Sequence, residues 1–196
     1  MRSRRLNPAL RLAVVGALVL ACQGQTPRFV SVGDVQLPIV VRPQFYTDCR
    51  SAAEALSSRE AAVAYIGYTF GAVPDRNNPN KHIFVVAVDT KRSYIEMPLL
   101  TWPTITPADS EHLTYLNNAL EWHERGHLAI AVAIAAEVTA AQHPVTSPAD
   151  GRAQAEDVIR ISNARQTAYD ELTMHGIHQS RAPEPLRGSD TIFYCR

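Results

Sequence analysis

The sequence predicts an α+β fold, in which a small, mostly antiparallel sheet packs on a long antiparallel helix pair. Three observations support this prediction. Short runs rich in valine, isoleucine and aromatic residues fill most of residues 27–103. Two helix-start signals follow, at Thr106-Pro107 and Ser147-Pro148. The helix between them carries the motif HExxH at residues 123–127.

Length and composition are those of a globular protein. The 196 residues fit one domain, or one domain plus an export segment. The contents of 46% hydrophobic and 19% charged residues are ordinary values for a chain that buries a core. With 19 basic and 19 acidic residues, the formal net charge is zero. Because nucleic-acid-binding proteins usually carry a basic excess, we expect no nucleic-acid partner.

The first residues predict export. An apolar run at residues 12–21 is too short to span a bilayer comfortably, and it follows Arg2, Arg4, Arg5 and Arg11. This pattern indicates a signal peptide at residues 1–21 and a destination in the periplasm or envelope of a bacterium. Residues 19–22, Val-Leu-Ala-Cys, resemble a lipobox, so that a lipid on Cys22 would anchor the protein to the membrane. Cleavage by an ordinary signal peptidase after Ala21, or a little later, stays open as the alternative.

The cysteines fit an oxidising compartment. Apart from Cys22, only Cys49 and Cys195 remain, one near each end of the mature chain. We predict a disulfide between them, which in the chain-entropy model would stabilise the fold by about 4–5 kcal/mol.

The first half of the single domain, residues 27–103, should consist mainly of strands. Short strands are expected at residues 28–41, in runs rich in valine, isoleucine and leucine that Gly33 and Pro38 interrupt, and a short helix is expected at 51–62. Further strands are expected at 64–70, 83–88 and 93–100, with turns at 73–80 and 89–92.

The second half should be the helix pair, at residues 106–176. One helix is expected from residue 107 to Gln142, and the other from 148 to His175 with Gly176 as its stop. A short loop joins them, so the helices must be antiparallel neighbours. Residues 177–196 should form an extended tail.

The motif at residues 123–127 indicates a metal site. His123 and His127 are four residues apart, so both side chains project from one helix face and can bind one Zn²⁺. Zinc lowers the pKa of a bound water toward neutrality, and Glu124 beside the first ligand would act as general base on that water. The alternative is a helix that carries two unrelated histidines.

Residues 99–179 resemble the predicted secreted zinc-dependent protease family of bacteria. The resemblance rests on the segment Leu99-Leu100-Thr101-Trp102-Pro103, on the motif at 123–127 followed by Ile130-Ala131, and on residues 169–179, Tyr-Asp-Glu-Leu-Thr-Met-His-Gly-Ile-His-Gln. It implies a zinc peptidase of the zincin-like type.

The third zinc ligand must come from the second helix. The family motif points to His175, whereas the register of an antiparallel hairpin places Asp170 at the level of the motif. We take His175 as the third ligand, and Asp170 either as the alternative ligand or as a residue that orients an imidazole. Tyr169 or His178 would stabilise the transition state.

These features together predict an exported zinc metallopeptidase that acts on a peptide or protein substrate. Two alternatives remain. One is a zinc hydrolase of cell-wall amides, and the other is an inactive envelope lipoprotein with a structural or degenerate metal site. An open fourth coordination position would separate the enzymes from the structural protein.

Overall fold

The computed structural model of the chain describes residues 27–57 and 62–173, and the predicted α+β class is confirmed. The described elements are β1 (Phe29–Val32), β2 (Val35–Phe45), α2 (Cys49–Ser57), β3 (Val63–Tyr65), β4 (Tyr68–Asp75), β5 (Asn78–Val88), β6 (Tyr94–Thr101), α3 (Pro107–Ala140), β7 (Pro144–Val145) and α4 (Pro148–Thr173).

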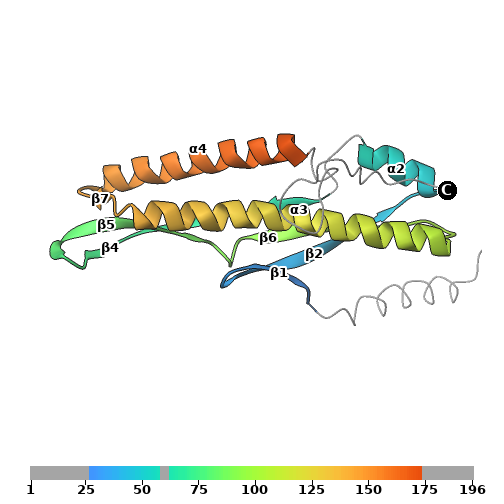
Figure 1. Cartoon of the computed structure of the whole chain (residues 1–196), viewed down its shortest axis with the longest axis horizontal. Coiled ribbons are helices and arrows are strands. Elements are labelled where there is room, and N and C mark those ends of the chain that lie inside the picture. Colours follow the sequence, from blue (N-terminus) through green and yellow to red (C-terminus); the bar gives the residue numbers. More distant parts are fainter. Residues whose placement is uncertain (1–26, 58–61, 174–196) are drawn as a thin grey trace, which may run out of the picture.

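The long helix α3 runs along the molecule, with the strands on one side of it and α4 on the other (Figure 1). The strands form two sheets rather than the one expected, in the orders β1-β2-β6-β3 and β4-β5-β7. All neighbouring pairs are antiparallel except β2 and β6, which are parallel. A parallel pair needs a long crossover, and here α2, β3, β4 and β5 lie between its two strands.

The strand predictions were wrong in three places. The single strand expected at 64–70 is divided between β3 and β4, which belong to different sheets. The division falls at Gly67, whose N–H donates to Ser93 Oγ at 2.9 Å and whose carbonyl accepts from Asp89 N–H at 2.8 Å. Most of the turn expected at 73–80 is strand, with only a tight reversal between Asp75 and Asn78. The short strand β7 was not expected.

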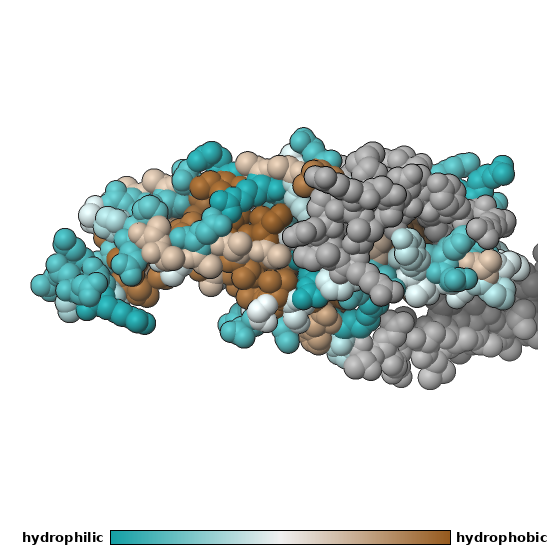
Figure 2. Space-filling model, viewed as in Figure 1, coloured by the Kyte–Doolittle hydropathy of each residue, from teal (hydrophilic) through white to brown (hydrophobic). Residues whose placement is uncertain are grey.

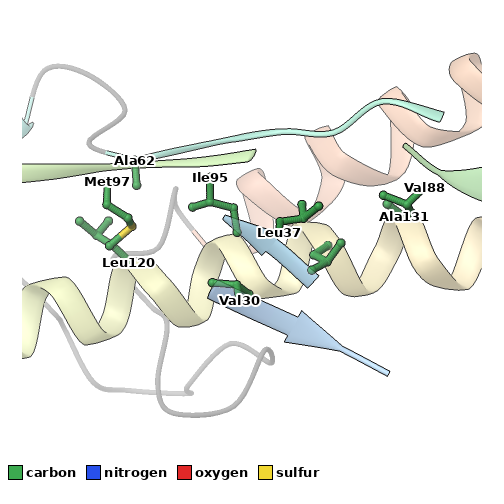
Figure 3. Packing of buried hydrophobic residues seen from close by; sticks show 9 residues of the cluster. Val30, Leu37, Ala62, Val88, Ile95, Met97, Leu120 and Ala131 are labelled. Carbon is green, nitrogen blue, oxygen red and sulfur yellow. The ribbon is translucent and has the colours of Figure 1, made fainter. Parts of the chain in front are cut away.

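The principal core lies between α3 and the four-stranded sheet. Leu120 and Ala131 of α3 face Leu37, Ile95 and Met97 of the strands (Figure 3). Each fully buried aliphatic side chain of this kind contributes about 1.5–3 kcal/mol. A second cluster, in which Phe84, Ile134 and Val158 are buried, joins β5, α3 and α4. Together the two clusters fix α3 between the strands and α4.

The N-terminus of α3 is confirmed at the predicted position. Thr106 Oγ1 accepts from Asp109 N–H at 3.1 Å, and the Asp109 carboxylate accepts from Thr106 N–H at 2.9 Å. This reciprocal capping satisfies two backbone donors of the first turn, and these hydrogen bonds lower the pKa of Asp109. The helix ends at Ala140, two residues before the expected end.

Several predictions fall on residues outside the description. They are the signal peptide, Cys22, the end of α4 at His175, the tail at 177–196 and Cys195. Cys49 at the start of α2 is disulfide-bonded to a partner outside the described residues, so the pairing with Cys195 stays a prediction. In the described ranges, no helix combines the length and the apolar character that crossing a membrane requires.

Candidate metal centre

The centre is built on the middle of α3. His123 and His127 lie one turn apart, and their rings are buried, with residue exposures of 1% and 6%. Their Nε2 atoms lie 3.1 Å apart and the rings are perpendicular to one another. The four-residue spacing of the motif therefore brings two potential ligand atoms to one point between α3 and α4.

Asp170 of α4 completes a group of three. Its Oδ1 lies 2.9 Å from His127 Nε2 and 3.2 Å from His123 Nε2. Within the part of the chain that the structure describes, these three residues form the one group of histidine, cysteine and acidic side chains that could hold a metal ion.

The spacing of the three atoms fits a small cation. Ligand atoms about 2.0–2.1 Å from a tetrahedral zinc ion lie about 3.3–3.4 Å from one another, and the separations here are 2.9–3.2 Å. Two imidazoles and one carboxylate are also a donor set that proteins use for zinc. The residues present therefore fit the ion in both spacing and chemistry.

The outer nitrogen of His127 contacts Gln166 of α4. Gln166 Oε1 lies 2.5 Å from His127 Nδ1, and the Gln166 side-chain nitrogen donates to the main-chain carbonyl of His127 at 3.1 Å. The second bond fixes which end of the amide faces the ring, so the carbonyl oxygen of Gln166 accepts from Nδ1–H.

The outer nitrogen of His123 is fixed in the same way by Thr173. The Thr173 hydroxyl donates to the carbonyl of Tyr169 at 2.8 Å, and its oxygen lies 3.2 Å from His123 Nδ1. Because the hydroxyl has only one proton, the ring nitrogen must be the donor in this contact.

This network assigns the proton of both imidazoles to Nδ1 and leaves both Nε2 lone pairs directed at the Asp170 carboxylate. Three acceptor atoms thus converge within 3.2 Å. Acceptors at this distance repel one another unless a cation or an added proton lies among them. The arrangement is the one expected when outer hydrogen bonds orient metal-ligating histidines.

Gly126 and Tyr169 bring the two helices into close contact at the centre. A Cβ atom on Gly126 would lie 2.0 Å from the Tyr169 hydroxyl oxygen, so only glycine leaves room for that ring. The hydroxyl donates to the main-chain carbonyl of His123 at 3.3 Å, and the ring stacks on the His123 imidazole at a centroid distance of 5.0 Å. Tyr169 therefore sets the distance between α3 and α4 next to Asp170.

Glu124 follows His123 in the chain and is buried, with a residue exposure of 1% and both carboxylate oxygens inaccessible. The four-residue spacing puts it on the same face of α3 as Leu120 and Leu128, which pack against the strands. Glu124 thus extends from α3 toward the strands, and its carboxylate is not among the three groups that converge between α3 and α4.

The structure therefore brings together His123, His127, Asp170 and Tyr169 of the predicted site. His175, the expected third ligand, and His178 lie outside the described residues, so neither is tested. The contacts of Tyr169 support a positioning role, and its action on a transition state stays a prediction.

The role of Gln166 was missed, and Thr173 was noted only as part of a motif. Their signal is a spacing: Gln166, Tyr169, Asp170 and Thr173 are separated by three, one and three residues, which places all four on one face of α4.

Comparison of the chain with protein-family models, with curated proteins and with solved structures finds no match. The function proposed below therefore depends on the geometry of the centre and on the motifs.

Proposed function

We propose that the protein is an exported zinc-dependent hydrolase that cleaves peptide bonds. The observation that carries the proposal is the convergence of two Nε2 lone pairs and one carboxylate oxygen within 3.2 Å, in a buried place between two helices. His123, His127 and Asp170 would hold the ion. A bound zinc ion supplies Lewis acidity, which favours deprotonation of water near neutral pH.

The residues of the chain would divide the remaining work. Glu124 would act as the general base that takes the proton of the attacking water and would then deliver that proton to the leaving amine. Gln166 and Thr173 would hold the imidazoles with their Nε2 atoms inward. Tyr169 would keep α4 at the distance that Asp170 requires.

The number of ligands decides between an enzyme and a structural site. Three ligands from the described residues would leave a fourth position for water and substrate, as catalytic zinc sites do. If His175 also bound the ion, four protein ligands would close the site, and the structural alternative would be favoured. The third ligand is therefore Asp170 in this proposal, with His175 as the residue to test.

Peptide bonds are the proposed substrate because the motifs resemble those of the predicted secreted zinc-dependent protease family, which implies a zincin-like peptidase. The leader sequence supports action in the periplasm or, with a lipid on Cys22, at the membrane. Hydrolysis of cell-wall amides is the second candidate, since the same chemistry acts on any amide.

The first experiment measures zinc content by mass spectrometry on periplasmically expressed protein lacking residues 1–22. We expect about one zinc per chain, lost in His123→Ala and Asp170→Ala and kept in His175→Ala and Glu124→Gln. Loss in His175→Ala with full occupancy in Asp170→Ala would overturn the ligand assignment. Absence of zinc in the wild-type protein, even after zinc is added, would overturn the proposal.

The second experiment measures cleavage of a denatured protein substrate and, separately, of purified cell wall. Glu124→Gln should keep its zinc and lose about 10²–10⁴-fold in rate, because general base catalysis contributes about that much. Equal rates for Glu124→Gln and the wild type would refute the role of Glu124. Release of fragments from cell wall alone would favour the second candidate.

A further inference from the structure

The strand β4 has one edge that pairs with nothing in the described structure. It is the end strand of its sheet, next to β5. Edges of this kind are usually covered or blocked because they accept further strands. The other edge of β5 is covered. The Thr139 hydroxyl accepts from Val86 N–H at 3.0 Å and donates to the Val86 carbonyl at 3.2 Å. Phe84 N–H donates to the His143 carbonyl at 2.8 Å.

These contacts identify the groups on the open edge. In an antiparallel pair of strands, the backbone N–H and C=O groups of alternate residues either bond to the partner strand or point away from it. The backbone groups of Val86 and Phe84 point away from β4. The residues of β4 that lie opposite them are Phe70 and Ala72. The N–H and carbonyl groups of Phe70 and Ala72 therefore lie on the open edge.

Pro74 agrees with this alternation. It lies two residues after Ala72, opposite His82, so its nitrogen also belongs to the open edge and β5 loses no hydrogen bond there. The open edge thus includes complete pairs of donor and acceptor at Phe70 and Ala72, followed by the carbonyl of Pro74.

The side chains of the same residues line a groove. A depression of about 720 Å³ lies between this face of the sheet and the first turns of α4. Its apolar lining includes Phe70, Ala72, Phe84, Val145 and Ala155. Phe70 is 37% exposed and stacks on the buried Phe84 at a centroid distance of 5.9 Å.

The groove carries positive charge at its border and is distant from the metal centre. The charge comes from Arg152, which lines the groove, is exposed and forms no ion pair with any described residue. The carboxylate of Asp150, at the start of α4, already accepts from Thr146. Ala155 and Asp170 lie on one helix, about 22 Å apart at 1.5 Å per residue. The hydropathy surface shows hydrophilic residues at the tip of the β4–β5 hairpin and apolar residues nearer the middle of the molecule (Figure 2).

We propose that the open edge of β4 and the adjoining groove form a docking site for an extended peptide segment, which adds to the sheet as a further strand. The backbone of the peptide would pair with Phe70 and Ala72. A peptide residue opposite either one points its side chain to the same face of the sheet, so its alternate apolar side chains would enter the groove. A carboxylate on the peptide would meet Arg152.

The test uses a capped seven-residue peptide in which valine alternates with threonine and one terminal valine, on the face that enters the groove, is replaced by aspartate. Binding is measured by fluorescence anisotropy, and amide hydrogen exchange by NMR, on the mature protein. We expect saturable binding and slower exchange at the amides of Phe70 and Ala72, with no change at Thr69 and Gly71, which already belong to the ladder. No binding, or binding without that protection, would overturn the proposal.

Two modifications test the backbone contacts independently. Ala72→Pro removes one edge donor without removing a ladder hydrogen bond, and it should weaken binding about tenfold, as expected for one hydrogen bond. A peptide N-methylated at the residues that face the edge should also fail to bind, and this result does not depend on how the variant folds. Undiminished binding of the N-methylated peptide would contradict strand addition.

The charge contact has a matched control. Arg152→Ala should weaken binding about threefold to tenfold, and the difference should shrink in high salt. Arg160→Ala, an exposed arginine of the same helix that pairs with Asp157, should leave binding unchanged. Equal effects of the two substitutions would show that Arg152 does not contact the peptide. Removal of zinc should not alter binding, so the outcome does not depend on the proposed hydrolase activity.

Discussion

Replacing Gly126 by alanine tests how the two helices are held together at the metal centre. The added Cβ would lie 2.0 Å from the Tyr169 hydroxyl oxygen and 2.3 Å from Cζ of the same ring. Carbon atoms make favourable contacts only at about 3.5–4.0 Å. The ring must therefore move away from the new Cβ by roughly 1 Å or more. Asp170 follows Tyr169 in the chain, so we expect it to leave the two imidazoles.

Two effects of opposite sign set the magnitude. Alanine favours a helix interior over glycine by about 1 kcal/mol, and inserting a methyl group into a filled space costs about 1–3 kcal/mol. The free energy of unfolding of Gly126→Ala should therefore fall by about 0–2 kcal/mol. The affinity for zinc should fall further, by about tenfold or more, because the ligand itself is displaced.

The assay is urea denaturation followed by circular dichroism, together with zinc titration against a chelator. In a Tyr169→Leu background the clash is absent, so Gly126→Ala should stabilise the protein by about 1 kcal/mol. Gly151→Ala is the matched control, since a Cβ there meets only Val145 at 3.8 Å, and it should stabilise the wild type. The reasoning is refuted if Gly126→Ala has the same effect in both backgrounds.

Two further predictions concern the outer contacts and the helix cap. Gln166→Ala should lower zinc affinity about 10–100-fold without loss of fold, whereas Gln166→Glu, which keeps the acceptor for His127 Nδ1–H, should bind zinc at least as well as the wild type. Equal affinities in all three proteins, measured by chelator competition, would exclude the role of Gln166. The folded pKa of Asp109 is lowered by the hydrogen bonds that cap α3, so its contribution to stability is present above the unfolded pKa of about 3.9 and is lost as the pH falls through the folded value. The difference in unfolding free energy between Asp109→Asn and the wild type should thus be large at neutral pH and small in acid, and a difference independent of pH would contradict this.

The helices were predictable because their signals are local. Thr106 and Pro107 fix the start of α3 through contacts within one turn, and the structure places it there. The same locality explains why Asp170 was recognised as a candidate: two long helices joined by a short loop have a register that follows from their rise per residue.

The sheets were less predictable because strand pairing is decided by distant residues. Val63–Tyr65 and Tyr68–Asp75 read as one run, yet they join different sheets, since Ser93 and Asp89 take the hydrogen-bonding groups of Gly67. Gln166 was missed for a related reason. A glutamine on a helix is ordinary until the neighbouring helix shows that it faces His127.

The few buried side chains of α4 have a consequence for the lifetime of the protein. They are Val158, Ser162, Tyr169 and Thr173, and the last two contact His123. Little apolar surface therefore holds the end of α4 in place, and an ion bound between Asp170 and α3 would stabilise the packing of α4 against α3. By mass action, a ligand present at about 1,000 times its dissociation constant adds about 4 kcal/mol to folding. For the proposed zinc protein, the supply of zinc would then set how long each copy resists degradation by proteases.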